Sequence, residues 1–335
     1  MKKRLNVIDI FSGCSGLSTG FSKENFNVIL GIDFFESALK TFKENHPNSK
    51  ILNKDIKKVT GKEIKKLTGN KKTHVIVGGP PCQGFSMAGK RRPNDPRNSL
   101  FMEYVRLVKE LNPDFFVMEN VRGILSMKNG KGEKVIDIIL KEFENIKERG
   151  KKKYGVELHR VNTADYGVPQ KRNRIFIIGH KPKYKFSFPK ETHSKKGGKL
   201  KKWVGLKDII IPKSKVDKKY FYSQKLIDGF IRRGKKNKKR KMGFGWQFLN
   251  KNEPSTTISA RYYKDGAEAL VKYNNSYKEG SIRRLTPKEC ALIQSFPKSF
   301  KFEGTDNEIY LQIGNAVPPK MAQVIAKPIK KALIL

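Results

Sequence analysis

Short apolar runs alternate with helix-patterned segments through the first half of the chain. Each run is bounded by turn-forming residues, as expected for buried strands. The runs occupy residues 5–11, 28–32, 75–77, 115–118 and 175–178. Apolar residues at three- and four-residue spacing predict helices at residues 36–45, 100–111 and 133–146. This alternation of strands and helices predicts an α/β fold, in which helices cover a parallel sheet. In such folds ligands bind beyond the carboxyl ends of the strands.

The apolar periodicity weakens after about residue 183. Two basic clusters follow, and the second, at residues 232–241, is basic at eight of ten positions. Such a run is typical of a solvated loop, and direct contact with phosphates is an equally good interpretation. The first cluster lies at residues 195–202. We interpret residues 184–280 as a smaller, irregular second domain inserted into the chain.

Helical order returns near the end of the chain. Thr286 stands three residues before Glu289 and is followed by Pro287, which is a capping-box pattern with proline at the first helical position. A last helix is expected over residues 318–333. We therefore predict three segments: residues 1–183 form the catalytic and cofactor-binding domain, 184–280 the second domain, and 281–335 return to complete the first.

The charge of the chain makes nucleic acid the first partner to consider. Lysine and arginine number 72 against 31 acidic residues, a formal charge of +41, and such an excess favours a polyanion. An anionic membrane surface or a lysine-decorated soluble surface are the alternatives. A spanning helix needs ~20 apolar residues, and the apolar runs here are far shorter. Asp9 interrupts the apolar start too early for a signal peptide, so a soluble cytoplasmic protein is expected.

Three cysteines, Cys14, Cys82 and Cys290, form no Cys-x-x-Cys pair, which argues against a disulfide framework or a zinc site. Cys82 stands in the segment Gly-Gly-Pro-Pro-Cys-Gln-Gly-Phe-Ser at residues 78–86. A lone cysteine is more often a packed thiol. Two prolines that fix the backbone before Cys82 favour a directed nucleophile instead. The residues after Cys82 are basic and turn-forming, which is typical of a loop that closes over a bound strand.

Polar residues follow several of the predicted strands. The first strand leads into a turn with Gly13 and Gly16, whose spacing is not the dinucleotide fingerprint. The second ends at Asp33, which suits a ribose contact or a helix cap, and the cap is the simpler interpretation. Glu119 follows residues 115–118. Arg172 and Arg174 precede the last strand, where alternation would place both on one face. Taken separately, such charged groups are commonly surface ion pairs.

Six segments, taken together, resemble the ordered motifs of bacterial-type DNA (cytosine-5)-methyltransferases. They are Phe11-Ser12-Gly13-x-x-Gly16, Pro81-Cys82-Gln83, Glu119-Asn120-Val121, Gln170-x-Arg172-x-Arg174, Arg284-Leu285-Thr286-Pro287-x-Glu289 and Gln312-x-Gly314-Asn315-Ala316-Val317. The resemblance spans nearly the whole chain. It implies a Rossmann-like S-adenosyl-L-methionine-dependent methyltransferase domain with a smaller, irregular target-recognition domain. It further implies a monomer that modifies double-stranded DNA within a restriction-modification system, whose endonuclease acts on the same site without a stable complex.

The resemblance also implies which residues hold the cofactor, S-adenosyl-L-methionine. Asp33 would bind the ribose, although many relatives carry the longer glutamate there, and Phe34 would pack on the adenine. The full set is Phe11, Gly13, Gly16, Leu17, Asp33, Phe34, Asp55, Ile56, Pro80, Leu100, Asn315 and Ala316.

The same resemblance supplies a mechanism and makes Cys82, Glu119, Arg172 and Arg174 the catalytic set. Addition of the Cys82 thiolate to C6 of cytosine makes C5 nucleophilic, and Glu119 would protonate or hydrogen-bond N3. An arginine directly against Glu119 would oppose its protonation. We therefore expect an arginine, Arg174 rather than Arg172, to contact the substrate instead. A base that the sequence does not identify removes the C5 proton.

A stacked cytosine cannot present both faces, so the base must be flipped out of the duplex. Residues 256–260 resemble the part of the recognition domain that supports such a base. The DNA contacts implied are Ser86, Lys90, Arg91, Arg92, Gln170, Thr256, Thr257 and Arg261.

Three alternatives differ in class or substrate. A tRNA cytosine-C5 methyltransferase shares the Pro-Pro-Cys motif, but its Cys-Phe-Thr signature does not occur here. A catalytically silent DNA-binding protein would not need Cys82, Glu119 and Arg174 together. A Rossmann-type oxidoreductase is excluded by the glycine spacing and gives Cys82 no role.

Overall fold

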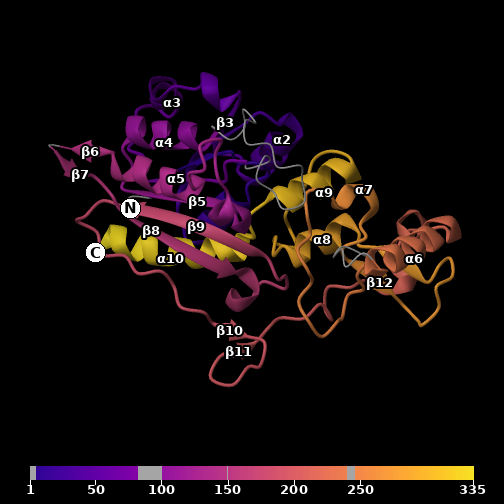
Figure 1. Ribbon diagram of the computed structural model, residues 1–335. Coiled ribbons are helices and arrows are strands. Elements are labelled where there is room, and N and C mark those ends of the chain that lie inside the picture. The colour runs from indigo at the N-terminus through magenta and orange to yellow at the C-terminus, as the bar shows by residue number, and fades with distance from the viewer. Residues whose placement is uncertain (1–4, 82–99, 149, 240–245) are drawn as a thin grey trace. The chain divides into compact units, whose positions relative to one another are not determined.

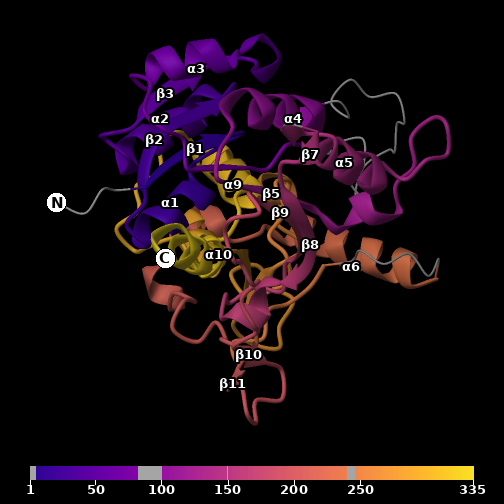
Figure 2. The same ribbon diagram turned by 90° about the vertical axis from the view of Figure 1, so that its left-hand side faces the viewer.

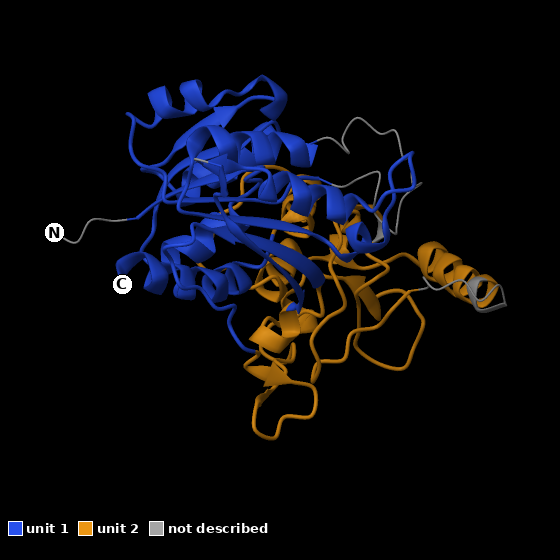
Figure 3. Ribbon diagram, turned by 60° about the vertical axis from the view of Figure 1, so that its left-hand side comes forward, with its two compact units in different colours: residues 1–162, 173–190, 317–335 blue, residues 163–172, 191–316 orange. Residues whose placement is uncertain are grey.

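The chain forms two compact units in a computed structural model that describes residues 5–81, 100–148, 150–239 and 246–335. Unit 1 comprises Met1–Asn162, Asn173–Lys190 and Val317–Leu335, and unit 2 comprises Thr163–Arg172 and Glu191–Ala316 (Figure 3). Unit 2 therefore contains residues 163–172 and 281–316 in addition to most of the segment 184–280. The roles assigned to the three segments stay predictions.

A seven-stranded sheet forms the centre of unit 1. In order across the sheet the strands are β3 (Lys50–Asn53), β2 (Asn27–Asp33), β1 (Asn6–Ile10), β4 (Val75–Gly78), β5 (Phe115–Val121), β9 (Asn173–His180) and β8 (Gly155–Asn162). The first five are parallel, as predicted. The prediction is wrong for β9, which runs antiparallel to both β5 and β8 because no helix crosses over between β8 and β9.

The apolar runs predicted the five interior strands because those strands are almost wholly buried. Nearly all residues of the edge strands β3 and β8 are partly or fully exposed, so these strands left no such signal. A short hairpin of β6 (Lys147–Glu148) and β7 (Lys151–Lys152) precedes β8.

Helices cover both faces of this sheet (Figures 1 and 2). The helices of unit 1 are α1 (Gly16–Lys23), α2 (Glu36–Asn45), α3 (Gly61–Leu67), α4 (Leu100–Leu111), α5 (Val135–Glu144) and α10 (Pro319–Ile334), with the 3-10 turns η1 (Ile56–Lys58) and η4 (Arg122–Ser126). The predicted helices 36–45 and 100–111 are confirmed, and 133–146 is shorter at both ends. Helices α1 and α10 lie on the face opposite α4 and α5. They approach so closely that a Cβ on Gly20 would lie 2.4 Å from Cβ of Ala322.

Unit 2 is irregular, with short strands and four helices among its described residues. They are β10 (His193–Ser194), β11 (Lys201–Lys202), β12 (Leu270–Lys272), β13 (Ile282–Arg284), α6 (Gln224–Lys239), α7 (Tyr262–Asp265), α8 (Pro287–Ile293) and α9 (Asp306–Asn315), with the turns η5 (Thr163–Tyr166), η6 (Lys213–Lys215) and η7 (Lys218–Tyr220). The capping box predicted for α8 is confirmed, with Glu289 N–H donating to Thr286 Oγ1 at 3.2 Å.

One expectation for this unit is wrong. The basic cluster at residues 232–241 was expected to be a loop, yet residues through Lys239 continue α6, and the last two residues lie outside the described chain. The helix forms because Ile227, Phe230 and Ile231 recur at helical spacing and pack with Tyr222 and Leu270. None of the helices among the described residues is long and apolar enough to cross a membrane.

Candidate active site

The turn after β1 has an unusual backbone. Phe11, Gly13 and Ser15 all have left-handed φ angles of 61°, 49° and 82°, and α1 begins immediately afterwards at Gly16, with Leu17 buried. A Cβ on Gly13 would meet nothing within 4 Å, so the turn leaves open space above this residue. Such a turn before a helix is a suitable place for a ligand to approach the backbone.

Asp33, at the end of β2, holds this turn in place. Its carboxylate accepts hydrogen bonds from Gly13 N–H at 2.8 Å and from Phe35 N–H at 2.9 Å, and burial raises the pKa of its carboxyl group. The N-cap of α2 is Phe35, so the interpretation of Asp33 as a helix cap is wrong. Phe34 is 75% exposed, which leaves an aromatic face open at the same strand end.

Asp9 lies within β1, before the turn, and the sequence pattern assigned it no role beyond interrupting an apolar run. It is fully buried, and its Oδ2 accepts hydrogen bonds from the Ser18 side chain at 2.6 Å and backbone at 3.2 Å. Its Oδ1 is buried and has no hydrogen-bond partner among the described residues. Burial raises the pKa of Asp9 to about 7, although the Ser18 hydrogen bonds act in the opposite direction. A charged residue inside an apolar strand was the signal that could have identified it.

The other predicted cofactor residues in unit 1 are placed as follows. Asp55 is exposed and caps η1 by accepting from Lys57 N–H at 3.0 Å. Ile56 and Leu100 pack in or against the hydrophobic core that lies under α3, α4 and α5. Pro80 is buried, and its carbonyl accepts from the Asn120 side chain at 3.3 Å. Their contacts with the cofactor stay predictions.

Glu119 and Arg174 meet at adjoining strand ends. Val121 lies opposite Arg174 in the β5–β9 ladder, so Glu119, two residues earlier on the same face, is the diagonal neighbour of Arg174. Arg174 Nε lies 2.9 Å from Glu119 Oε1, with the two side chains 13% and 10% exposed. Burial lowers the pKa of Arg174, and Glu119 offsets part of that effect. The expectation that Arg174 would not lie directly against Glu119 is therefore wrong.

The second carboxylate oxygen of Glu119 faces the neighbouring strand end. A Cβ on Gly79 would lie 3.2 Å from Glu119 Oε2, and a Cβ on Gly78 only 2.1 Å from the Ile10 carbonyl. Glycine is therefore required at position 78, where β4 ends, four residues before Cys82. The nucleophile candidate Cys82 and the predicted DNA contacts Ser86, Lys90, Arg91 and Arg92 lie outside the described residues.

Arg172 does not join Arg174. It precedes β9, belongs to unit 2 and is 2% exposed, so the prediction that the two arginines share a strand face is wrong. Its guanidinium donates to the carbonyls of Ile258 at 3.2 Å and Gly314 at 3.0 Å. A guanidinium enclosed in this way has a structural role within unit 2, and its place in the catalytic set stays a prediction.

Gln170 is also buried within unit 2. Its side-chain amide donates to Gln294 Oε1 and accepts from Ile258 N–H at 3.3 Å. The amide would have to leave both partners to reach DNA, and the predicted contact stays a prediction. Gln294 itself was missed, since nothing in the sequence links two glutamines 124 positions apart.

The predicted DNA-facing segment of unit 2 is only partly enclosed. Thr256 and Thr257 are half-buried, and their hydroxyls donate to the carbonyls of Glu268 at 2.7 Å and Lys171 at 2.8 Å. Arg261 is exposed. Asn315, at the end of α9, is exposed, and Ala316 is half-buried.

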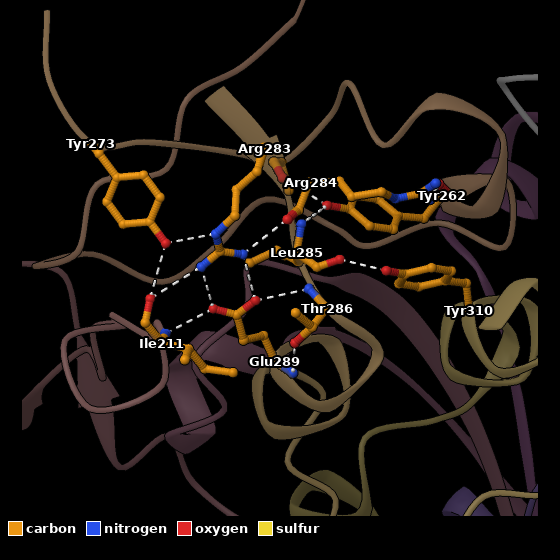
Figure 4. Close-up of polar contacts among 10 residues, drawn as sticks. Ile211, Tyr262, Tyr273, Arg283, Arg284, Leu285, Thr286, Glu289 and Tyr310 are labelled. Carbon is orange, nitrogen blue, oxygen red and sulfur yellow. Dashed lines mark hydrogen bonds and ion pairs between the residues drawn. The ribbon is translucent and has the colours of Figure 1, made fainter. Parts of the chain in front are cut away.

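A fully buried ion pair between Arg283 and Glu289 lies at the start of α8 (Figure 4). Arg283 donates to both oxygens of Glu289 at 2.7 and 2.8 Å, and neither side chain is exposed. The same carboxylate accepts from the backbone N–H groups of Thr286 and Ile211, each at 2.8 Å, and Tyr273 accepts from Arg283 Nε at 2.7 Å. Every oxygen and nitrogen of the pair is engaged, so this motif holds the fold of unit 2.

Comparison with known proteins gives one consistent result. The family model described as C-5 cytosine-specific DNA methylase matches residues 5–331. The chain is 36% identical to the type II methyltransferase M.FnuDI of Fusobacterium nucleatum, covering 98% of this chain and 95% of that protein, and 35% identical to M.SsoII of Shigella sonnei, covering 98% and 81%. The Entamoeba histolytica methyltransferase EhMeth, at 20% identity, shares the fold over 99% of both chains with a TM-score of 0.75.

Proposed function

Because the chain belongs to the C-5 cytosine-specific DNA methylase family and is a DNA cytosine-5 methyltransferase, we propose that it methylates C5 of a cytosine flipped out of a specific duplex site. The observation that carries this proposal is the Glu119–Arg174 pair at the strand end beside Gly79. A carboxyl group is thereby fixed next to the segment that leads into Cys82, where an acid is needed.

S-adenosyl-L-methionine is the methyl donor in this proposal, and the turn after β1 fits it. The open space above Gly13 admits a ligand close to the backbone, and the exposed ring of Phe34 offers a face for the adenine. Asp33 would contact the ribose. When bound, the cofactor supplies a methyl group on a positively charged sulfur. Phe11, Gly16, Leu17, Asp55, Ile56, Pro80, Leu100, Asn315 and Ala316 complete the proposed set of contacts.

Cys82 is the proposed nucleophile. Its thiolate adds to C6 of the cytosine, which forms a sulfur–carbon bond and moves the ring electrons toward C5 and N3. C5 then accepts the methyl group. A base removes the C5 proton, and the returning electron pair expels the thiolate and restores the ring.

Glu119 acts on the developing charge of the ring. A proton or hydrogen bond delivered to N3 lowers the barrier to attack at C6. Arg174 occupies Oε1 of the carboxyl group, and Oε2 faces Gly79. Oε2 is the oxygen presented to the base. When the base enters, Arg174 turns from Glu119 to the substrate, which frees the carboxyl group to take up the proton that it delivers to N3.

Duplex DNA is the proposed partner, and the formal charge of +41 supports its capture. Thr256, Thr257 and Arg261 would face the flipped nucleotide, and Ser86, Lys90, Arg91 and Arg92 would close over the strand. The type II methyltransferases to which the chain is similar support a role in a restriction-modification system. In that role a monomer protects cytoplasmic DNA from an endonuclease that acts on the same site without a stable complex.

Transfer of radiolabelled methyl groups from S-adenosyl-L-methionine to DNA tests the proposal. Wild-type protein should label cytosine in duplex DNA, and Cys82→Ala should abolish labelling while it retains cofactor binding. Cys290→Ala is the matched control, because this thiol is buried in α8 and should not matter for labelling. Equal labelling by Cys82→Ala would refute the mechanism, and preferential labelling of tRNA would identify a different substrate. Methylation-resolved sequencing would identify the target site.

A further inference from the structure

Arg172 links two segments of unit 2 that are far apart in sequence. One guanidinium nitrogen donates to the carbonyl of Ile258 and the other to the carbonyl of Gly314. Gly314 lies in the last turn of α9, where carbonyls lack partners within the helix. A positive charge at a helix carboxyl end is also favourable to the helix dipole. The Arg172 guanidinium thus caps the carboxyl end of α9 and hydrogen-bonds the backbone of Ile258 at the same time.

Two glutamines complete the connection. Gln170 accepts from Ile258 N–H and donates to Gln294, which donates in turn to the carbonyls of Ile313 at 3.1 Å and Ala316 at 2.6 Å. Both glutamines are fully buried. Polar groups enclosed in this way cannot exchange a lost hydrogen bond for one with water, so the arrangement is held firmly.

The two segments also touch directly. A Cβ on Gly314 would lie 2.3 Å from the Ser259 carbonyl and 2.5 Å from Ala260 N, so only glycine allows the backbones to approach this closely. From this contact each segment continues toward the surface. Asn315 follows on one side and Arg261 on the other, and both are exposed.

We propose that Arg172 is a positioning residue that couples cofactor binding to DNA binding. This inference rests on the proposed function, in which Asn315 and Ala316 contact the cofactor while Thr256, Thr257 and Arg261 contact DNA. Because one guanidinium holds the backbone of both segments, a ligand that orders one segment orders the other. Each ligand then tightens the binding of its counterpart by the same factor, as thermodynamic linkage requires.

Arg172→Lys tests the coupling. The planar guanidinium supplies two donors in a fixed fork, whereas lysine offers a single compact ammonium group that does not reproduce the fork. The dissociation constant of a duplex containing the target site is measured with and without saturating S-adenosyl-L-homocysteine. In wild-type protein the constant without S-adenosyl-L-homocysteine should be about fivefold or more larger than the constant with it, and Arg172→Lys should bring this ratio close to one.

Reduced stability alone would not give this result. A ligand that binds only the folded state restores part of the folded population, which would raise the measured ratio of a destabilised variant. Arg283→Lys is the matched control, because it disturbs an equally buried arginine of the same unit that donates to neither segment. It should be less stable and keep the wild-type ratio. Gln294→Met, which removes the donors to Ile313 and Ala316, should lower the ratio even if Arg172→Lys fails to fold.

A wild-type ratio near one, an unchanged ratio in the folded Arg172→Lys and Gln294→Met proteins, or an equal loss in Arg283→Lys would each overturn the inference. These outcomes are distinct from failure of the proposed function. That function fails if wild-type protein neither binds S-adenosyl-L-homocysteine nor labels duplex DNA.

Discussion

Two arginine–glutamate pairs in this protein have the same chemistry and opposite surroundings. Arg283 and Glu289 are fully buried, make two parallel hydrogen bonds and receive further backbone donors (Figure 4). Arg174 and Glu119 make one contact at a strand end, and the second oxygen of Glu119 faces Gly79. A saturated pair can only hold structure, whereas a pair with one oxygen to spare can act on a ligand.

The largest effect is expected from Glu119→Gln. The amide cannot deliver a carboxyl proton to N3, so turnover should fall by ~10²- to 10⁴-fold. The melting temperature should fall less than in Glu289→Gln, because Arg174 makes a single contact with Glu119 whereas Arg283 makes two with Glu289. Single-turnover methylation and thermal unfolding measure the two effects. Unchanged turnover would remove Glu119 from the catalytic set.

Glu289→Gln should give the reverse result. It leaves the Arg283 charge buried without its counter-charge, and breaking such a pair costs about 3–5 kcal/mol of unfolding free energy. Denaturant titration measures the loss, and methylation per folded molecule should be retained. The exposed pair of Lys152 and Glu144 provides the control, since Glu144→Gln should cost at most about 1 kcal/mol. If Glu289→Gln and Glu144→Gln lost equal unfolding free energy, burial would not be what makes the Arg283–Glu289 pair stronger than the Lys152–Glu144 pair.

Asp9 gives a pH-dependent test of a third buried carboxyl group. Its folded-state pKa of about 7 lies above the ordinary value of 3.8, so the folded chain binds the proton more tightly. The favourable contribution of protonated Asp9 is fully present below pH 3.8 and is lost as the pH rises to about 7. The unfolding free energy of Asp9→Asn minus that of wild type should therefore rise across this window, by at most about 1.4 kcal/mol per pH unit, and then level off.

Denaturant titrations at several pH values measure this difference. A flat line for Asp9→Asn would show that burial of Asp9 does not change its proton affinity.

The smallest effect concerns the open side of the site. Phe34→Ala removes a ring that packs on little of the protein, so stability should be nearly unchanged. Loss of an aromatic stacking partner is worth about 0.5–1.5 kcal/mol, which corresponds to a few-fold to tenfold weaker binding of S-adenosyl-L-homocysteine. Calorimetric titration measures this change. Wild-type affinity in the variant would exclude Phe34 from the adenine contact.

The sequence predicted the interior strands and the capped helix α8 because both depend on local patterns. Buried strands need continuous apolar runs, and a capping box needs Thr286 and Glu289 three positions apart. Helix α6 was missed because its lysines and arginines dominate its composition. Only the packing of Ile227 and Phe230 shows that one face of this basic segment is buried.

By itself the sequence determined the family, the order of its motifs and the residue types that can perform the chemistry, because these follow from side chains and their spacing along the chain. Only the tertiary structure decided how the two arginines of Gln170-x-Arg172-x-Arg174 divide their roles. Strand β9 begins between them, so Arg174 enters the ladder beside Glu119 while Arg172 stays in unit 2 under Ile258 and Gly314. Partners separated by 86 and 142 positions leave no local pattern, so only the folded chain shows that Arg172 is enclosed by unit 2 while Arg174 lies against Glu119.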